Sequence, residues 1–568
     1  MKRSTIKGRG LVILAGVLIV AGLLLSACGS SDGGGGASPS AAATPKPGGT
    51  YVYPIGADPI SIEPLNLQEA DAAQITHQVF QGLYILALQP DGTTKAVPDL
   101  AEKTEMSPDA KTFTFTIKQG VTFAPPVSRE VTAQDFVDCW NYVLDAKNKS
   151  ALGPYIFQNL AGLDPKTGYR AGDSLSSVKV ISKYTFQVTL ASAFSQFPVT
   201  LCNDVSKVFP ADYATKVGLK AFFEKPVGTG PYMVEDWKHT QSVTLVKNPD
   251  YWNTSGSGNS AGPGYVDTIS YPIYRDVSTT YLAFQKGTVD FSSLPPGSFI
   301  AAGNLPDVKN GTWTLEAYPS TSVYFIGVSM NKPMLGGSEN LPIRAALNFA
   351  ADRDAISNVV NQGVSIPSDE IVPVTIPGYV PGLNPYPTDP AKAQPELDKF
   401  TAAGGTIPAN IPFWFNSGAG HDKIAQALVA GWQKAMPSLT FKLSGIETNA
   451  YWTGLSENKP PALFRMGWVA DYPSIDNFIY LFTTKGGKYG SYTQYSNPQV
   501  DDLFTQARAA MDVTEGNNLY NEAQKLILAD APSIPLYTYR DARITNNRIG
   551  GFNYNAFALT DMWKLWVK

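Results

Sequence analysis

Alternation of apolar and polar residues predicts β-strands in two segments of the chain. In each segment three apolar residues are separated by single polar residues, which is the period of a strand with one buried face. The apolar positions are Phe113, Phe115 and Ile117 in the first segment and Phe186, Val188 and Leu190 in the second. Both segments are therefore expected to lie in sheets that cover a core.

A helical spacing of three and four residues between apolar positions appears farther along the chain. It occurs at Ile343, Ala346, Leu347 and Ala350, at Ile424, Leu428 and Trp432, and at Val500, Leu503, Phe504, Ala507 and Met511. This spacing predicts three helices with one apolar face each. Strand and helix signals alternate without a detectable repeat, so the sequence predicts an α/β protein of several lobes.

Two segments are predicted to be loops because of their composition. Residues 253–264 are rich in Gly, Ser and Asn, and residues 367–390 are rich in Pro. These residue types favour turns and interrupt regular backbone hydrogen bonding.

The first 27 residues have the layout of an export signal. Basic residues precede an uncharged apolar run from Leu11 to Leu25, which has fifteen residues, fewer than the roughly 20 that a spanning helix needs. The string Leu25-Ser26-Ala27-Cys28 follows and resembles a bacterial lipobox. That resemblance implies removal of residues 1–27 and a lipid anchor on Cys28, since two or more acyl chains hold a protein stably at a membrane. A plain transmembrane anchor is the alternative.

Residues 29–49 are almost entirely Gly, Ser, Ala, Pro and Thr. Such a segment cannot bury enough apolar surface to offset the entropy lost on ordering. We therefore expect residues 28–49 to be a lipidated cysteine with a flexible tether. The remainder, residues 50–568, is long enough for two or three domains.

Charge and cysteine content narrow the possible functions. The formal net charge is -4, and no strong Lys/Arg cluster occurs beyond the signal, so we expect no nucleic-acid partner. The mature chain contains Cys139 and Cys202 besides Cys28. An oxidising exterior permits a disulfide between these two residues, and two buried free thiols are the alternative.

The sequence lacks the spacing signatures of metal, cofactor or nucleotide sites. The three histidines, His77, His239 and His421, are widely separated and belong to no zinc motif. Gly228-Thr229-Gly230 is not followed by the third glycine of a dinucleotide fingerprint, and no Gly-Lys-Ser/Thr occurs. We therefore predict no metal and no cofactor.

One string could indicate a hydrolase. Gly258-Asn259-Ser260-Ala261-Gly262 has the pattern of a nucleophile elbow. An elbow requires an apolar strand before the serine and a helix after it, whereas here Gly, Ser, Asn and Pro flank it. A catalytic Ser260 therefore remains an alternative, and a binding protein without catalysis is the main prediction.

The segment Arg465 to Pro473 is suited to the rim of a pocket. It places a glycine, a large aromatic residue and a single acid, Asp471, before a proline. A partly buried carboxylate needs a cation or several donors to stay charged. Either a ligand ammonium or an internal Arg or Lys could serve Asp471, and the residues alone leave both possibilities open.

Five strings in order resemble motifs of one family, the extracellular solute-binding proteins that serve oligopeptide and dipeptide ABC importers. The strings are residues 227–232 with 247–252, 344–353, 467–473, 495–501 and 531–537. The resemblance covers essentially the whole chain after the tether. It implies a two-lobed periplasmic-binding-protein-like fold of type II, with an additional domain inserted in the first lobe.

The resemblance also implies boundaries for these parts. Lobe one would comprise residues 50–81, 227–318 and 534–568, the additional domain residues 82–226, and lobe two residues 319–533. The string Gly228 to Pro231 would supply a tight crossing between parts, and Asp352 with Arg353 would form a pair on a helix surface.

In peptide-binding relatives the ligand lies extended and pairs with protein strands. By resemblance, Asp471 matches the residue that holds the peptide ammonium, and the pairing strand matches Gly467, Trp468 and Val469. Further matches are Tyr451, where relatives carry a tryptophan beside the ligand, Arg465, which would meet the peptide carboxylate, and Glu69 and Ala70 within the lobe-one loop Gln68 to Ala72.

The implied function is capture of peptides outside the cell and delivery to the permease of an ABC importer, by a monomer held at the membrane by lipid. Other solutes bound within the same family, namely oligosaccharides, nickel chelates and opines, remain alternatives. A surface hydrolase that uses Ser260 and a purely structural lipoprotein are the alternatives from other classes.

Overall fold

The computed structural model describes residues 44–65, 69–457, 459–484, 486 and 492–568. All of these except Thr44 belong to one compact unit, Pro45–Lys568. The signal, Cys28 and most of the expected tether, and Gln68 of the expected ligand loop, lie outside the described residues.

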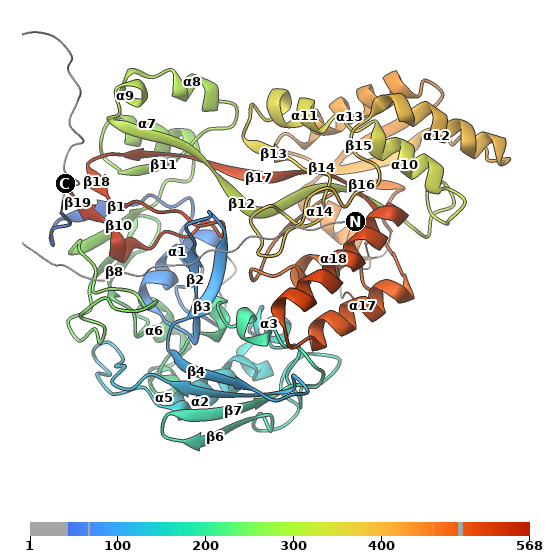
Figure 1. Ribbon diagram of the computed structural model, residues 1–568. Helices are drawn as coiled ribbons and strands as arrows, with labels where there is room; N and C mark the ends of the chain where they lie inside the picture. The colour runs from blue at the N-terminus through green and yellow to red at the C-terminus, as the bar shows by residue number, and fades with distance from the viewer. Residues whose placement is uncertain (1–43, 66–68, 458, 485, 487–491) are drawn as a thin grey trace, which may run out of the picture. The chain divides into compact units, whose positions relative to one another are not determined.

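The largest sheet has seven strands and extends along two long strands that are far apart in the sequence. β12 and β17 run antiparallel side by side (Figure 1). The order is β11 (Phe291–Ser293), β17 (Ser533–Asn546), β12 (Trp313–Val328), β16 (Leu463–Val469), β14 (Ile411–Asn416) and β15 (Phe441–Ile446), with β13 (Ser365–Pro367) also paired to β17.

A four-stranded sheet brings the beginning of the folded chain to its middle part. Its order is β1 (Thr50–Val52), β10 (Thr268–Pro272), β9 (Ser242–Lys247) and β8 (Tyr232–Lys238), with only β1 and β10 parallel. The chain ends in a two-stranded sheet of β18 (Ile549–Gly550) and β19 (Trp566–Val567).

Two antiparallel sheets lie within residues 82–226. One contains β2 (Tyr84–Leu88) and β3 (Thr94–Pro98), and the other has the order β4 (Ala101–Met106), β5 (Thr112–Ile117), β7 (Thr185–Thr189) and β6 (Val178–Ser182). β5 and β7 confirm both strands predicted from the alternation. Their apolar residues are almost fully buried, since that face covers a core.

Helices surround these sheets. They are α1 (Ala70–Val79), α2 (Ala133–Val143), α3 (Gly153–Ile156), α4 (Phe197–Thr200), α5 (Ala211–Val217), α6 (Leu219–Glu224), α7 (Val277–Gln285), α8 (Phe299–Gly303), α9 (Pro306–Lys309), α10 (Leu341–Phe349), α11 (Arg353–Ala355), α12 (Pro390–Ala402), α13 (His421–Ala435), α14 (Thr448–Ser456), α15 (Asp476–Ile479), α17 (Pro498–Ala509) and α18 (Val513–Asp530).

Short 3₁₀ turns occur at Ala146–Asn148, Asp204–Ser206, Tyr480–Phe482 and Met562–Lys564, and a π-helical turn occurs at Ile356–Val360. α10, α13 and α17 confirm the three predicted helices. Ala350 lies one residue beyond the end of α10 but is buried, whereas Met511 lies beyond the end of α17 and is about half exposed. Both predicted loops lie between regular elements: residues 253–264 contain none, and residues 367–390 only meet β13 and α12 at their ends.

Two glycines allow the chain to pass close to the end of α1. A Cβ at Gly228 would lie 2.1 Å from the carbonyl oxygen of Val79, and one at Gly230 would lie 2.4 Å from that of Gln78. Both distances are far below contact distance with backbone atoms that cannot move aside. Glycine is therefore required here by close backbone approach.

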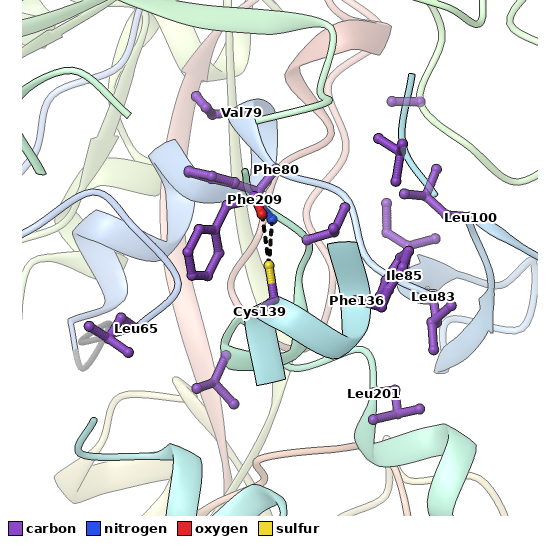
Figure 2. Close-up of a cluster of buried hydrophobic side chains, with 14 of the residues drawn as sticks. Leu65, Val79, Phe80, Leu83, Ile85, Leu100, Phe136, Cys139, Leu201 and Phe209 are labelled. Carbon is purple, nitrogen blue, oxygen red and sulfur yellow. Dashed lines mark hydrogen bonds between the residues drawn. The ribbon is translucent and has the colours of Figure 1, made fainter. Parts of the chain in front are cut away.

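The cysteines form no disulfide with each other, and the alternative of two buried free thiols holds for Cys139 and Cys202. The Cys139 thiol donates to the carbonyl oxygen of Phe209 at 2.8 Å, and the Phe209 amide donates back at 3.1 Å (Figure 2). Phe136, Leu201 and other apolar side chains surround this thiol in the core. Burial raises the pKa of Cys139 well above its ordinary value, so the thiol stays protonated and bonds to backbone instead of sulfur.

The prediction that Asp352 and Arg353 form a pair on a helix surface is wrong. Arg353 is buried, and its guanidinium donates to the carbonyl oxygens of Pro535 and Asn348. Asp352 instead caps α11 by accepting from the amide of Ala355. The two residues are adjacent, but their side chains serve different elements.

Candidate functional site

The outer edge of β16 is open along its C-terminal half. β16 pairs along its whole length with β12, whereas its pairing with β14 ends at Phe464. The Ala470 amide donates to the carbonyl oxygen of Thr321, in the middle of β12, so the even-numbered residues of β16 bond to β12. The odd-numbered Gly467 and Val469 therefore direct their N–H and C=O groups toward the free edge.

Within the described chain, no backbone group bonds to Gly467 or Val469 from that edge. The Val469 side chain is 63% exposed. A free edge of this kind can receive an additional extended chain, whose backbone supplies the missing partners.

A cavity of about 300 Å³ lies beside the open edge. Four of the predicted ligand residues, Arg465, Gly467, Trp468 and Val469, line it. The full lining is Ser320, Ser322, Val323, Trp452, Arg465, Gly467, Trp468, Val469, Tyr539 and Asp541. We call it the Arg465 cavity.

Arg465 brings a partly buried positive charge to this cavity. Its guanidinium donates to the Tyr539 hydroxyl at 3.2 Å and lies 5.0 Å from the ring centre of Tyr324. Its Nε is buried without a hydrogen-bond partner. No carboxylate of the described residues lies within salt-bridge distance of Arg465, and a partly buried guanidinium in this state favours an anionic ligand.

Gly467 leaves room for this guanidinium. A Cβ at that position would lie 3.0 Å from the carbonyl oxygen of Val323 and 3.4 Å from an Nη atom of Arg465. Any side chain at position 467 would crowd the backbone of β12 and the Arg465 guanidinium. The close packing of these two groups therefore accounts for the glycine.

Asp471 lies just beyond β16 and has only uncharged partners. Its carboxylate accepts from the Tyr155 hydroxyl at 3.0 Å and from the Asn477 amide at 3.3 Å. No Lys or Arg in the described ranges lies within salt-bridge distance of it. Burial raises the pKa of Asp471 to about 6, against the lowering effect of these two hydrogen bonds. The sequence left open whether an internal Arg or Lys pairs with Asp471. No such partner lies among the described residues.

Asn477 connects Asp471 to Trp468. Its side-chain oxygen accepts from the Trp468 indole at 2.8 Å and from the Asp471 amide at 3.2 Å, while its nitrogen reaches the Asp471 carboxylate. The fully buried side chain of Asn477 therefore holds both Trp468, which lines the Arg465 cavity, and Asp471 in place.

Tyr451 does not reach the cavity. Its side chain is fully buried, and its hydroxyl donates to the carbonyl oxygen of Arg465. Trp452, the next residue on α14, lines the cavity instead. Tyr451 and Leu455 are four residues apart and share the buried face of α14, and this spacing was the signal that could have directed the prediction to Trp452.

The predicted lobe-one residues lie at the start of α1. Ala70 is exposed and lines a second cavity of about 260 Å³, while the Glu69 carboxylate accepts from the Ile60 amide at 3.1 Å. The second cavity contains a carboxylate that was not predicted, Asp71, and we call it the Asp71 cavity. Its lining is Tyr53, Pro54, Ile55, Gly56, Ala70, Asp71, Gln74, Tyr274, Arg275, Val277, Thr280, Phe291, Ser293, Arg543, Tyr554 and Ala558.

Two side chains of β17, bridged by the Tyr554 hydroxyl, connect the two cavities. Asp541 lines the Arg465 cavity, and Arg543, two residues along the same strand, lines the Asp71 cavity. The Tyr554 hydroxyl donates to Asp541 at 3.3 Å and accepts from Arg543 at 2.8 Å. The two openings are therefore neighbours along one strand.

Ser260 has the contacts of a structural residue. Its hydroxyl accepts from the Lys118 ammonium at 2.9 Å and donates to the carbonyl oxygen of Asp99 at 3.2 Å. A nucleophilic serine needs a base that accepts its proton, whereas here Lys118 donates. The segment before Ser260 contains no strand, which the elbow geometry requires.

Two kinds of feature are absent from the described residues. No group of three or more His, Cys, Asp and Glu side chains is arranged to hold a metal ion. No helix in the described ranges combines the length and apolar character needed to span a bilayer.

Comparison with known proteins identifies the family. The profile described as "Bacterial extracellular solute-binding proteins, family 5 Middle" matches residues 95–490. Oligopeptide-binding protein OppA of Bacillus subtilis (strain 168) is 27% identical over 552 residues, covering 94% of this chain and 95% of its own. The dipeptide-binding protein of Escherichia coli (strain K12) is 27% identical over 461 residues, covering 78% and 81%.

Solved structures share the fold. OppA of Haemophilus influenzae in complex with RPPGFSPFR superposes with a TM-score of 0.68 at 21% identity, covering 91% of this chain and 98% of its own. The α/β fold of periplasmic binding proteins, predicted from the motif order, is thereby confirmed. The chain belongs to the bacterial extracellular solute-binding proteins of family 5.

Several residues of the site were not predicted from the sequence. They are Tyr155, Asn477 and Tyr539, which contact Asp471 or Arg465, and Ser320 and Ser322 in the cavity wall. Tyr155 lies more than three hundred positions before Asp471, so no local pattern could have paired them.

Proposed function

We propose that this protein captures peptides outside the cell and delivers them to the membrane permease of an ABC importer. The ligand would lie extended between the two lobes, along the outer edge of β16. Two relatives are an oligopeptide-binding and a dipeptide-binding protein, which supports a peptide ligand.

The open edge beside Arg465 is the observation that carries this proposal. A peptide backbone can pair with Gly467 and Val469, and its carboxylate can neutralise the Arg465 guanidinium. Every peptide has these groups, so such a site gains affinity without reading side chains.

Asp471 is proposed to hold the peptide ammonium. Its carboxylate is oriented by Tyr155 and Asn477 and lacks a cation in the described chain. A ligand ammonium would supply that cation and stabilise the charged form.

The remaining parts of the proposal concern the context of the site. The protein would be a monomer, without catalytic activity, cofactor or nucleic-acid partner, and held at the outer face of the membrane by lipid on Cys28. The lipobox-like string and the composition of residues 29–49 support the anchor and its tether. The boundaries of lobe one, the additional domain and lobe two remain as the motifs predict.

Two measurements test the peptide assignment. Native mass spectrometry of protein purified without denaturation should reveal a co-purified peptide, and calorimetry should detect binding of trialanine. A co-purified sugar, nickel chelate or opine, without peptide binding, would contradict the assignment. Hydrolysis of the added peptide that Ser260→Ala abolishes would favour the hydrolase instead.

Arg465 gives a sharper test of the carboxylate contact. Arg465→Met should weaken trialanine binding by about 1.5–3 kcal/mol, the range for a charged hydrogen bond, and should change binding of the C-terminal amide much less. Lys423→Met, an exposed change on α13, is the matched control. Equal losses for acid and amide would place the carboxylate elsewhere.

A further inference from the structure

Asp71 lies in the first turn of α1 and is held in a fixed orientation. One carboxylate oxygen, Oδ2, accepts from the amides of Gly56 and Ala57 at 2.8 and 3.2 Å. These two bonds fix the carboxylate on the wall of the Asp71 cavity. The cavity therefore presents a positioned acid, and not a freely rotating surface side chain.

The second oxygen of Asp71 has no partner among the described residues. Oδ1 accepts no hydrogen bond from any residue that the structure describes, and none of their cations lies within salt-bridge distance. Burial raises the pKa of Asp71. The carboxylate thus retains one unsatisfied oxygen next to open space.

Arg543 is the nearest candidate for an internal counter-ion, but it is engaged elsewhere. Its guanidinium donates to Tyr554 through Nε and Nη2, and to the Ser293 hydroxyl at 3.0 Å through Nη1. Asp541 lies 3.7 Å from it. Arg543 and Asp541 together are neutral, so the charge of Asp71 is left over.

Arg275 also lines the cavity. It is exposed, where water and salt screen its charge. Four aromatic side chains also line the cavity, namely Tyr53, Tyr274, Phe291 and Tyr554. Aromatic walls suit the apolar stem and the cationic head of a lysine or arginine side chain.

We propose that the Asp71 cavity is a second subsite, which binds a basic side chain of the peptide. This inference rests on the proposed function, since the side chain belongs to a peptide held by β16. The cavity adjoins the Arg465 cavity through Asp541, Tyr554 and Arg543, so one extended ligand can reach both. The subsite would make the protein prefer peptides that contain lysine or arginine.

Matched peptides separate this preference from peptide binding as such. We would measure Kd by calorimetry for trialanine and for tripeptides with lysine, or its uncharged isostere norleucine, at each position in turn. At the preferred position the wild-type protein should bind the lysine peptide about tenfold tighter than the norleucine peptide, as expected for one charged contact.

Asp71→Asn should abolish that tenfold difference and leave trialanine binding unchanged. The variant keeps an oxygen for the Gly56 and Ala57 amides, so the local fold is retained. The control is Asp354→Asn, which replaces an exposed aspartate in the first turn of α11 and should keep the lysine preference.

The possible outcomes are distinct. Failure of every peptide to bind would overturn the proposed function itself. Binding without a lysine preference, or a lysine preference that Asp71→Asn leaves intact, would overturn only the subsite. An equal loss for all peptides in Asp71→Asn would show that Asp71 takes the terminal ammonium, which also overturns it.

Discussion

Asp471, which is partly buried, and Asp476, which is fully buried, lie five residues apart in contrasting surroundings. Asp476 accepts from Arg508 at 2.7 and 3.0 Å and from the hydroxyls of Tyr472 and Tyr520. Asp471 accepts only from Tyr155 and Asn477. The charge of Asp476 is thus paired within the chain, whereas Asp471 has two uncharged donors and no cation among its described partners.

The surroundings of Arg508 strengthen this contrast. Its guanidinium stacks between Phe194 and Phe504, at 4.3 and 4.6 Å from the ring centres, and donates to Asn159 at 3.1 Å. α17, which carries it, packs against α18 (Figure 1). Arg508 thus joins segments that are distant in the sequence, since its guanidinium donates to both Asp476 and Asn159.

Breaking the ion pair between Asp476 and Arg508 should have the largest effect, a loss of folding stability. Asp476→Asn leaves the buried Arg508 charge without its partner, which typically costs about 3–5 kcal/mol of stability. Urea unfolding followed by tryptophan fluorescence measures it, with the exposed Asp502→Asn as control. The double variant with Arg508→Gln should recover part of the loss, and a loss below about 1 kcal/mol for the single variant would contradict a structural role.

Removing the charge of Asp471 should affect binding more than folding. Asp471→Asn is expected to weaken trialanine binding by about 1.5–3 kcal/mol, because the ammonium loses a charged hydrogen bond. Calorimetry against wild type and Asp502→Asn measures this. N-acetylated trialanine, which carries no ammonium, should bind both proteins equally, and unchanged affinity for free trialanine would mean that Asp471 is not its partner.

Stability should depend on pH through Asp471. Its pKa is raised from 3.8 to about 6 in the folded ligand-free protein, so the neutral form stabilises the fold. That contribution is fully present below about pH 4 and is lost as the pH rises through about 6. We expect a difference of at most about 2 kcal/mol between pH 4 and 7 that is missing in Asp471→Asn. If the stability of wild type and of Asp471→Asn changes with pH in the same way, Asp471 makes no such contribution.

The smallest expected effect concerns the orientation of the acid. Tyr155→Phe removes one neutral donor from Asp471 and should weaken trialanine binding by about 0.5–1.5 kcal/mol. Tyr142→Phe on α2 is the matched control. If both variants bind alike, the Tyr155 hydroxyl contributes nothing to the site.

Much of the secondary structure could be predicted from local patterns. The period of two at Phe113 and Phe186 gave β5 and β7, and the helical spacing gave α10, α13 and α17. The prediction for Met511 failed because its spacing continues the helical pattern past the end of α17 at Ala509.

The site was only partly predictable. Motif order located the segment from Arg465 to Asp471, and the structure gathers four of its residues in one cavity. The same reasoning placed Tyr451 at the ligand, although the phase of α14 directs Trp452 to the cavity. The Cys139 and Cys202 thiols likewise could not be assigned, because a disulfide depends on a distance that spacing along the chain does not contain.

The sequence by itself determined the family, the α/β fold and the segments that carry the candidate site, because these follow from local periodicity and from motifs in order. Only the tertiary structure decided which charges are completed within the chain. Arg508 meets Asp476, Tyr155 meets Asp471, and Arg465 and Asp71 meet no opposite charge among the described residues. These contacts act over a few ångströms between residues that are 32 positions apart for Arg508 and Asp476 and 316 for Tyr155 and Asp471, so the folded chain alone reveals them.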